Sequence, residues 1–265
     1  MKNTLSTRWI QAMTIGLMVI GFTAVPLLAQ ELPPRPAADE RKPVDEFEEE
    51  ENAFYGGPFK PRPGIAGTIG FTTGGIYASF NLMRQFSPDQ IGFLSIGFTT
   101  ARDAQEIDRI DFFGNTFTFG PDPVSGQLIP KQNGILMMPV TVGLQQRLFR
   151  RDITNSFRPF VEVGLGPTVG YVFQLARLNP GGNPSNPDDY DYSFRGGIFN
   201  PRYVTIGANG FVGAGAYFGN NFMMLQGLTV RYVVNAFPTS VELLRGFPLN
   251  VFHGIALNLV FGTLL

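Results

Sequence analysis

The sequence has no cysteine and only one histidine. The first absence excludes disulfides, thiolate metal sites, cysteine catalysis and a lipoprotein anchor on an N-terminal cysteine. The second means that any histidine-dependent mechanism has to use His253. A formal net charge of -1 gives no basic surface for nucleic acid. Phosphate-binding loops, dinucleotide fingerprints and zinc spacings are also missing, so we expect neither a cofactor nor a metal.

What the chain does contain is 32 glycines and 26 phenylalanines. After residue 30 no apolar pattern of helical period runs for a useful length, and aromatic residues favour strands over helices. The composition therefore indicates an all-β protein.

Residues 1–29 have the features of an export signal. Lys2 and Arg8 precede an apolar run from Met13 to Leu28, and Pro26 stands shortly before the small residue Ala29. We predict cleavage after Ala29. The alternative is a retained membrane anchor, but the run is interrupted by polar residues and is near the lower length limit for a spanning helix.

Residues 30–63 form a proline-rich, acidic segment with four consecutive glutamates at 48–51. Such a composition buries too little apolar surface to offset the entropy of an ordered chain. We predict a disordered periplasmic tail. A solvated tail is its simplest role, and an arm that binds a periplasmic protein partner is the alternative.

The stretch from Phe157 to Phe173 has two unlike faces. Its odd positions carry large apolar residues, among them Val163, Leu165 and Phe173, whereas its even positions carry Glu162 and several glycines. Glycine is unfavourable in a strand unless other atoms approach closely. This pattern is typical of a narrow barrel whose apolar outer wall faces lipid.

The first connection between strand-like runs, Thr73-Gly74-Gly75, is a tight turn, and the later connections alternate between short and long. Short polar turns stand at 87–89, 150–156 and 219–221, and longer segments at 103–132, 176–201 and 237–246. Strands are predicted at 64–72, 76–86, 90–102, 133–149, 157–175, 202–218, 222–236 and 247–263. Residues 64–265 thus predict an eight-stranded antiparallel up-and-down transmembrane β-barrel, with both termini on the side of the short turns.

The stretch Arg158 to Phe173 and the alternating last strand resemble the small outer-membrane barrels of the OmpA transmembrane-domain and OmpX type. The resemblance implies a Gram-negative-type outer-membrane location, contact with lipid, lipopolysaccharide and the assembly machinery, and a structural or surface-recognition role without enzymatic activity. Outer loops are then the sites for an extracellular partner. One departure is the C-terminus, where Phe261 rather than the last residue is aromatic.

Three charged residues fall on the inward-facing parity of their strands: Glu162, Arg147 and Arg231. A charge inside a narrow barrel requires a partner of opposite sign. We predict that Glu162 forms an ion pair with one of the two arginines, giving a lumen ion-pair network that stabilises the barrel.

Two other functions fit parts of the pattern. A lipopolysaccharide deacylase would combine His253 with Ser240 and Glu242, although the histidine lacks the adjacent serine of that enzyme family. A periplasmic lipocalin-like barrel would turn the large apolar residues inward around a ligand. The aspartate-rich loop at 179–191 lacks the ligand spacing of a calcium loop, so a hydrophilic surface loop is the simpler interpretation.

Overall fold

The computed structural model describes residues 59–110, 116–122, 124, 126–150, 156–183, 186, 189–191, 199, 201–219, 221 and 223–265. The predicted signal peptide and almost all of the predicted tail lie outside these residues. Arg62–Leu265 forms one compact unit. Within the described part of the chain, no helix has the length and apolar character needed to cross a membrane.

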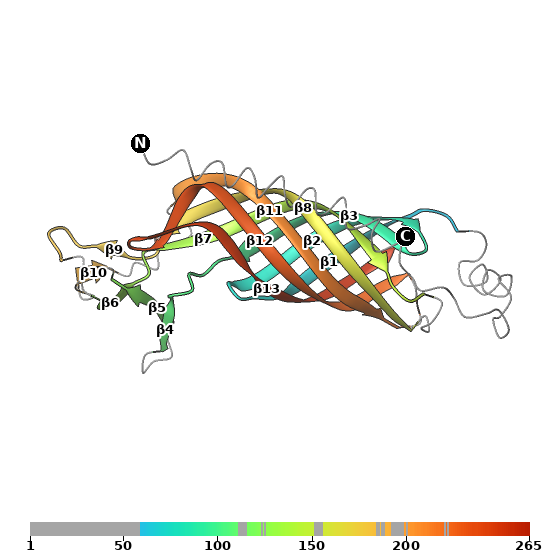
Figure 1. Ribbon diagram of the computed structural model, residues 1–265, viewed down its shortest axis with the longest axis horizontal. Coiled ribbons are helices and arrows are strands. Elements are labelled where there is room, and N and C mark those ends of the chain that lie inside the picture. The colour runs from blue at the N-terminus through green and yellow to red at the C-terminus, as the bar shows by residue number, and fades with distance from the viewer. Residues whose placement is uncertain are drawn as a thin grey trace, which may run out of the picture. The chain divides into compact units, whose positions relative to one another are not determined.

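Eight strands close into an antiparallel barrel (Figure 1). They are β1 (Arg62–Thr72), β2 (Gly75–Ser87), β3 (Gln90–Thr100), β7 (Asn133–Arg147), β8 (Phe157–Gln174), β11 (Pro201–Phe218), β12 (Met224–Leu244) and β13 (Phe247–Leu264). Each strand pairs with the next one along the chain, and β1 pairs with β13 to complete the circle. The predicted all-β, eight-stranded up-and-down fold is therefore confirmed.

One predicted connection is wrong. Residues 237–246 were expected to form a long loop, yet β12 continues to Leu244 and turns directly into β13. The register shifts between Ala236 and Val241, and Gly246 adopts a φ of 80° in the turn. Val241 and Leu243 are fully buried, so this segment is a hairpin held by apolar packing. In contrast, the tight first turn at Thr73 and Gly74 is confirmed.

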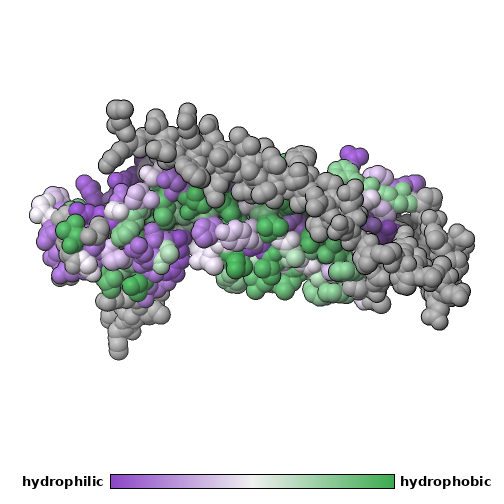
Figure 2. Space-filling model, viewed as in Figure 1, coloured by the Kyte–Doolittle hydropathy of each residue, from purple (hydrophilic) through white to green (hydrophobic). Residues whose placement is uncertain are grey.

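The outer wall of the barrel is apolar. Val163, Leu165, Val140 and Leu257 are 37%, 47%, 37% and 49% exposed, as the two-faced pattern predicts. Figure 2 shows hydrophobic residues grouped over the barrel strands and hydrophilic residues gathered toward the end that carries β4, β5 and β6. Further exposed apolar side chains on the same wall are Ile69, Phe80, Leu82, Ile96, Val142, Ile206, Val212, Leu228, Val230, Ile255 and Leu259.

Phenylalanines mark one rim of this wall. Phe86, Phe149, Phe157, Phe218 and Phe261 are exposed and lie at or beyond the strand ends joined by the short turns. We call this end the turn side and the opposite end the loop side. Phe149 follows the end of β7 with a φ of 54°, which explains why it departs from the alternation of that strand. The sequence predicts an aromatic rim at these strand ends, and its remaining predicted member, Phe222, lies outside the described residues.

The inner wall shows why glycine is needed. A Cβ added to Gly143 would lie 2.1 Å from the ring of Phe93, and one added to Gly164 would lie 2.6 Å from the ring of Phe211. The rings of Phe93 and Phe211 stack with their centroids 6.1 Å apart. Glycines therefore make room for large side chains that cross the lumen, which agrees with an eight-stranded barrel filled by its own residues.

Short strands build up the loop side. β4 (Ile107–Ile110), β5 (Thr116–Pro121) and β6 (Leu128–Pro130) form a three-stranded sheet, and β9 (Arg177–Leu178) pairs with β10 (Tyr190–Asp191). The sequence from Arg109 to Phe119 predicts a hairpin around Gly114 and Asn115. The pairing of β4 with β5 confirms it, and its tip at 111–115 lies outside the described residues. Long connections thus contain ordered structure.

Candidate functional site: the barrel lumen and the loop-side mouth

A bidentate ion pair lies in the turn-side half of the lumen. The Nε of Arg231 on β12 is 2.5 Å from Oε1 of Glu162 on β8, and its Nη2 is 3.1 Å from Oε2. Both residues are almost fully buried, at 4% and 2% exposure. Two parallel N–H···O bonds between charged groups are the strongest geometry available to such a pair.

Neighbouring side chains satisfy the remaining polar atoms of the pair. Gln145 on β7 donates from Nε2 to Oε2 of Glu162 at 3.0 Å, and the Tyr217 hydroxyl on β11 donates to Oε1 of Gln145 at 2.9 Å. Nη1 of Arg231 donates to the Tyr77 hydroxyl on β2 at 3.3 Å. Five strands are therefore connected through one buried network.

Arg147, the third predicted member, occupies a different place. Gln145 pairs in register with Glu162, while Arg147 pairs with Phe160 nearer the turn side. Within the described residues, the Glu162 carboxylate is bound by Arg231 and Gln145 rather than by Arg147. Arg147 instead lines a cavity of about 30 Å³ together with Arg158, which has room for about one water.

The next layer toward the loop side is neutral. Thr141 donates to Oδ1 of Asn209 at 3.0 Å, and Nδ2 of Asn209 donates to Oδ1 of Asn235 at 2.9 Å. These three residues come from β7, β11 and β12, and each is buried. The layer continues the filling of the lumen without adding charge.

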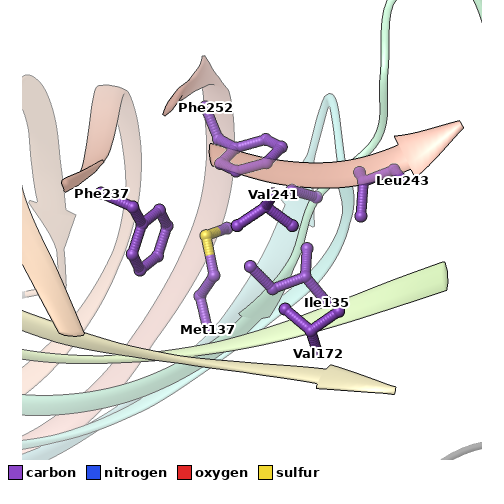
Figure 3. Packing of buried hydrophobic residues seen from close by; sticks show 8 residues of the cluster. Ile135, Met137, Val172, Phe237, Val241, Leu243 and Phe252 are labelled. Carbon is purple, nitrogen blue, oxygen red and sulfur yellow. The ribbon is translucent and has the colours of Figure 1, made fainter. Parts of the chain in front are cut away.

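An apolar cluster, which we call the loop-side plug, follows this layer (Figure 3). Met137, Phe237 and Phe252 point toward one another in Figure 3, with Val241 between Phe252 and Ile135. All members are between 0% and 7% exposed. The complete set is Ala101, Ile135, Met137, Val172, Phe237, Val241, Leu243 and Phe252.

The structure corrects the predicted position of one residue of the two-faced strand, near the plug. Phe173 was expected on the outer wall, but it is only 8% exposed. A Cβ on Gly134 of the neighbouring β7 would lie 2.4 Å from its ring, so Phe173 packs closely over that glycine. Near the loop side, therefore, apolar residues on both parities are buried.

Above the plug, ion pairs hold the three-stranded sheet against the end of β3. Nζ of Lys131 is 2.6 Å from Glu106, and Nη1 of Arg102 is 2.6 Å from Asp108. The hydrogen bond from Arg102 holds the pKa of Asp108 below its usual value, and burial lowers the pKa of Lys131 against the opposing pull of Glu106. The sheet is thus fastened electrostatically.

The β12–β13 hairpin packs on the same sheet. A Cβ on Gly120 of β5 would lie 2.4 Å from the side chain of Leu244, and Nη1 of Arg245 is 3.5 Å from Asp122. The backbone N–H of Gln132 donates to the carbonyl of Leu243 at 3.3 Å. The loop side is consequently one packed assembly.

A cleft opens in this assembly, and we call it the loop-side cleft. Its volume is about 550 Å³. It is lined by Gln132, Gln174, Ala176, Arg177, Leu178, Tyr190, Arg202, Glu242 and Arg245. The arginines lie far apart in the sequence, Arg177 and Arg245 in segments expected to be loops and Arg202 at the start of a predicted strand, and no spacing pattern connects them. Only the folded chain brings them together.

The residues of the possible hydrolase are spread along β12 and β13. His253 is exposed, pairs in register with Val234 and lies with its ring centroid 6.0 Å from that of Tyr232. Glu242 pairs with Pro248, five positions before His253 on β13, which corresponds to roughly 16 Å at about 3.3 Å per residue. Ser240 lies in the irregular stretch between Ala236 and Val241. A three-residue catalytic arrangement is therefore not assembled here.

No group of three or more potential metal-binding residues occurs in the described part of the chain. Asp188 of the aspartate-rich loop lies outside that part. Asp189 binds backbone, accepting from the N–H of Asn183 at 2.8 Å.

The fold and the lumen together define a class: a closed eight-stranded β-barrel with an apolar outer wall and a packed interior. No protein-family model matches the chain, and no curated protein matches it.

Solved structures of low similarity include three outer-membrane proteins. The outer membrane enzyme PagL has 12% identity and a TM-score of 0.34, covering 74% of this chain and 97% of its own. Neisserial surface protein A has 9% identity and a TM-score of 0.30, covering 76% and 92%. Ail, the attachment invasion locus protein of Yersinia pestis, has 11% identity and a TM-score of 0.30, covering 76% and 95%. Likeness at this level says nothing about activity.

Proposed function

We propose that this protein is an exported outer-membrane β-barrel without enzymatic activity, which acts as a structural element or presents its loop side for recognition at the cell surface. The observation that carries the proposal is the inverted barrel: large apolar side chains cover the outside, while Glu162 and Arg231 are paired inside. A strand wall of this kind is stable in a bilayer, since all its backbone groups are paired and its apolar face meets lipid.

The interior supports a non-conducting role. Among the described residues, stacked aromatic side chains, the ion pair and the loop-side plug fill the lumen, as expected of an eight-stranded barrel too narrow for a solute channel. The loop side supports a recognition role, because its two small sheets and the β12–β13 hairpin form an ordered surface on a rigid barrel. Lipid, lipopolysaccharide and the assembly machinery are the partners that this location implies.

Membrane fractionation tests the proposal directly. The full chain, expressed with its own N-terminus in a Gram-negative host, is expected in the outer-membrane fraction and to require detergent for release. Recovery as a soluble periplasmic protein would contradict the membrane assignment and favour a lipocalin-like barrel.

The alternative, a lipid-modifying enzyme, has its own test. Mass spectrometry of lipopolysaccharide from cells with and without the protein is expected to show identical acyl chains. The separation of His253 from Glu242 along the wall supports this expectation. An acyl-chain loss that disappears in His253→Ala would establish the enzyme instead.

A further inference from the structure

The loop-side cleft carries an excess of positive charge. Arg177, Arg202 and Arg245 face it together with a single acidic residue, Glu242. Oε1 of Glu242 accepts a hydrogen bond from the backbone N–H of Gly246, so its charge is already engaged at the hairpin turn. Three guanidinium groups beside one engaged carboxylate repel one another unless an anion joins them.

Two of these arginines have no acidic partner within the described residues. Arg245 is 3.5 Å from Asp122, whereas neither Arg177 nor Arg202 takes part in an ion pair there. Asp191 lies opposite Arg177 in the β9–β10 pair, but the two side chains form no ion pair. The cationic groups are therefore available to a ligand.

Arg202 is held in position by buried groups. Its Nη1 donates to Oδ1 of Asn133 at 3.0 Å, and Nδ2 of Asn133 donates to the backbone carbonyl of Glu242 at 2.6 Å. Asn133 is 1% exposed. One of the five N–H donors of this guanidinium is used, and the others remain for a ligand in a fixed orientation. Arg202 is itself exposed, and this bond fixes the orientation of its guanidinium at the edge of the cleft.

The walls and size of the cleft narrow the ligand class. Tyr190, Leu178 and Ala176 supply apolar surface, while Gln132 and Gln174 supply amide groups. Gln132 donates to the Tyr190 hydroxyl at 3.3 Å, which places an amide beside the aromatic ring. A volume of about 550 Å³ is typical of small-molecule sites. Aromatic and amide groups beside guanidinium groups suit a sugar ring that carries a phosphate.

We propose that the loop-side cleft binds a phosphorylated sugar, with Arg177, Arg202 and Arg245 contacting the phosphate. The loop-side plug closes the barrel below it, so the ligand is recognised at the mouth and is not transported. The inference deepens the proposed surface-recognition role and rests on it. The same chemistry occurs in a soluble sugar phosphate and in the head group of a phosphorylated glycolipid.

Calorimetric titration of the refolded full-length barrel tests the proposal. Glucose 6-phosphate and inorganic phosphate are the soluble probes in detergent micelles. Nanodiscs with and without lipopolysaccharide are the lipid probes. Binding of glucose 6-phosphate identifies a soluble source, and binding confined to lipopolysaccharide nanodiscs identifies a lipid-borne one. Either result supports the proposal. Absence of binding in both arms, or inorganic phosphate binding as tightly as the sugar phosphate, would overturn it.

Charge-neutral variants locate the binding. The single variant Arg177→Gln is expected to weaken binding of the phosphorylated probe by about tenfold or more, since it removes charge-assisted hydrogen bonds. The same holds for the double variant that combines Arg177→Gln with Arg202→Gln. Arg84→Gln is the matched control, because Arg84 is exposed on β2 toward the turn side and is expected to leave affinity unchanged. Equal affinity in Arg177→Gln, the double variant and the wild type would refute the assignment.

A folding readout separates this proposal from the proposed function. A folded barrel migrates differently from its heated form on a denaturing gel. A barrel that folds in micelles and enters the outer membrane but binds neither probe overturns the cleft proposal alone. A chain recovered as a soluble protein overturns the membrane assignment first.

Discussion

Replacing Glu162 by glutamine tests the central packing argument of the lumen. The change keeps the shape of the side chain but removes its charge, which leaves the guanidinium of Arg231, 4% exposed, without a counter-ion. Three contacts are affected: two from Arg231 and one from Gln145. Removing one partner of a buried pair costs about 3 to 5 kcal/mol, because the remaining charge stays desolvated.

The measurement is equilibrium unfolding of the detergent-refolded barrel in urea. The only tryptophan, Trp9, lies in the predicted signal peptide, so circular dichroism or gel mobility has to replace tryptophan fluorescence. Asp191→Asn is the control, since it makes the same chemical change at an exposed residue of β10 on the loop side. The double variant Glu162→Gln with Arg231→Gln is expected to recover part of the loss, because it leaves no isolated charge.

An unchanged urea midpoint in Glu162→Gln would refute this reasoning. It would mean that Arg231 finds water or another partner in the lumen, and that the pair is not required for stability.

Three further predictions concern the walls and the loop side. Gly166→Ala is expected to destabilise the barrel by about 1 to 3 kcal/mol, because its Cβ would lie 2.0 Å from the Val140 carbonyl oxygen. Gly210→Ala should be tolerated, since the nearest atom to its Cβ would be 3.7 Å away. The urea midpoints of the two variants test the difference. Leu257→Arg is expected to destabilise the membrane-inserted barrel by about 2 to 4 kcal/mol, the cost of an arginine on the lipid-facing wall at mid-bilayer. Ser240→Arg on the hairpin should leave the yield of folded protein unchanged. Equal yields from the two variants would contradict a lipid-facing wall. The lowered pKa of Asp108 means that its bond to Arg102 stabilises the loop-side sheet above the ordinary carboxyl pKa, and that this stabilisation is lost as the pH falls through the lowered value. Limited proteolysis should therefore cut the segment 103–132 faster in acid, and Asp108→Asn should show much of that sensitivity at neutral pH.

The barrel itself was predictable because a strand alternates with a period of two. Val163 and Leu165 are outside and Glu162 is inside, as their positions in the sequence require. Glycines such as Gly164 could be assigned to the narrow interior on the same grounds. The pairing partner of Glu162 could not be fixed, since Arg147 and Arg231 share the inward parity and only register distinguishes them.

The loop side was not predictable in the same way. Val241 and Leu243 were assigned to a loop because the alternation of short and long connections placed a long segment at 237–246. In the structure β12 continues to Leu244 with a shift in register, because these apolar residues pack into the plug. The cleft arginines carried no local signal, since their proximity depends on contacts between distant segments.

The pairing of β1 with β13 has a consequence for how the chain is made. Gly64 in the first barrel strand lies beside Leu264 in the last one, so the barrel cannot close until β13 has been synthesised. A nascent chain that stops short of β13 would have two edge strands whose backbone N–H and C=O groups are unpaired. Completion of the cylinder is thus a late event, and a ribosome that halts early yields a molecule that cannot shield its own backbone.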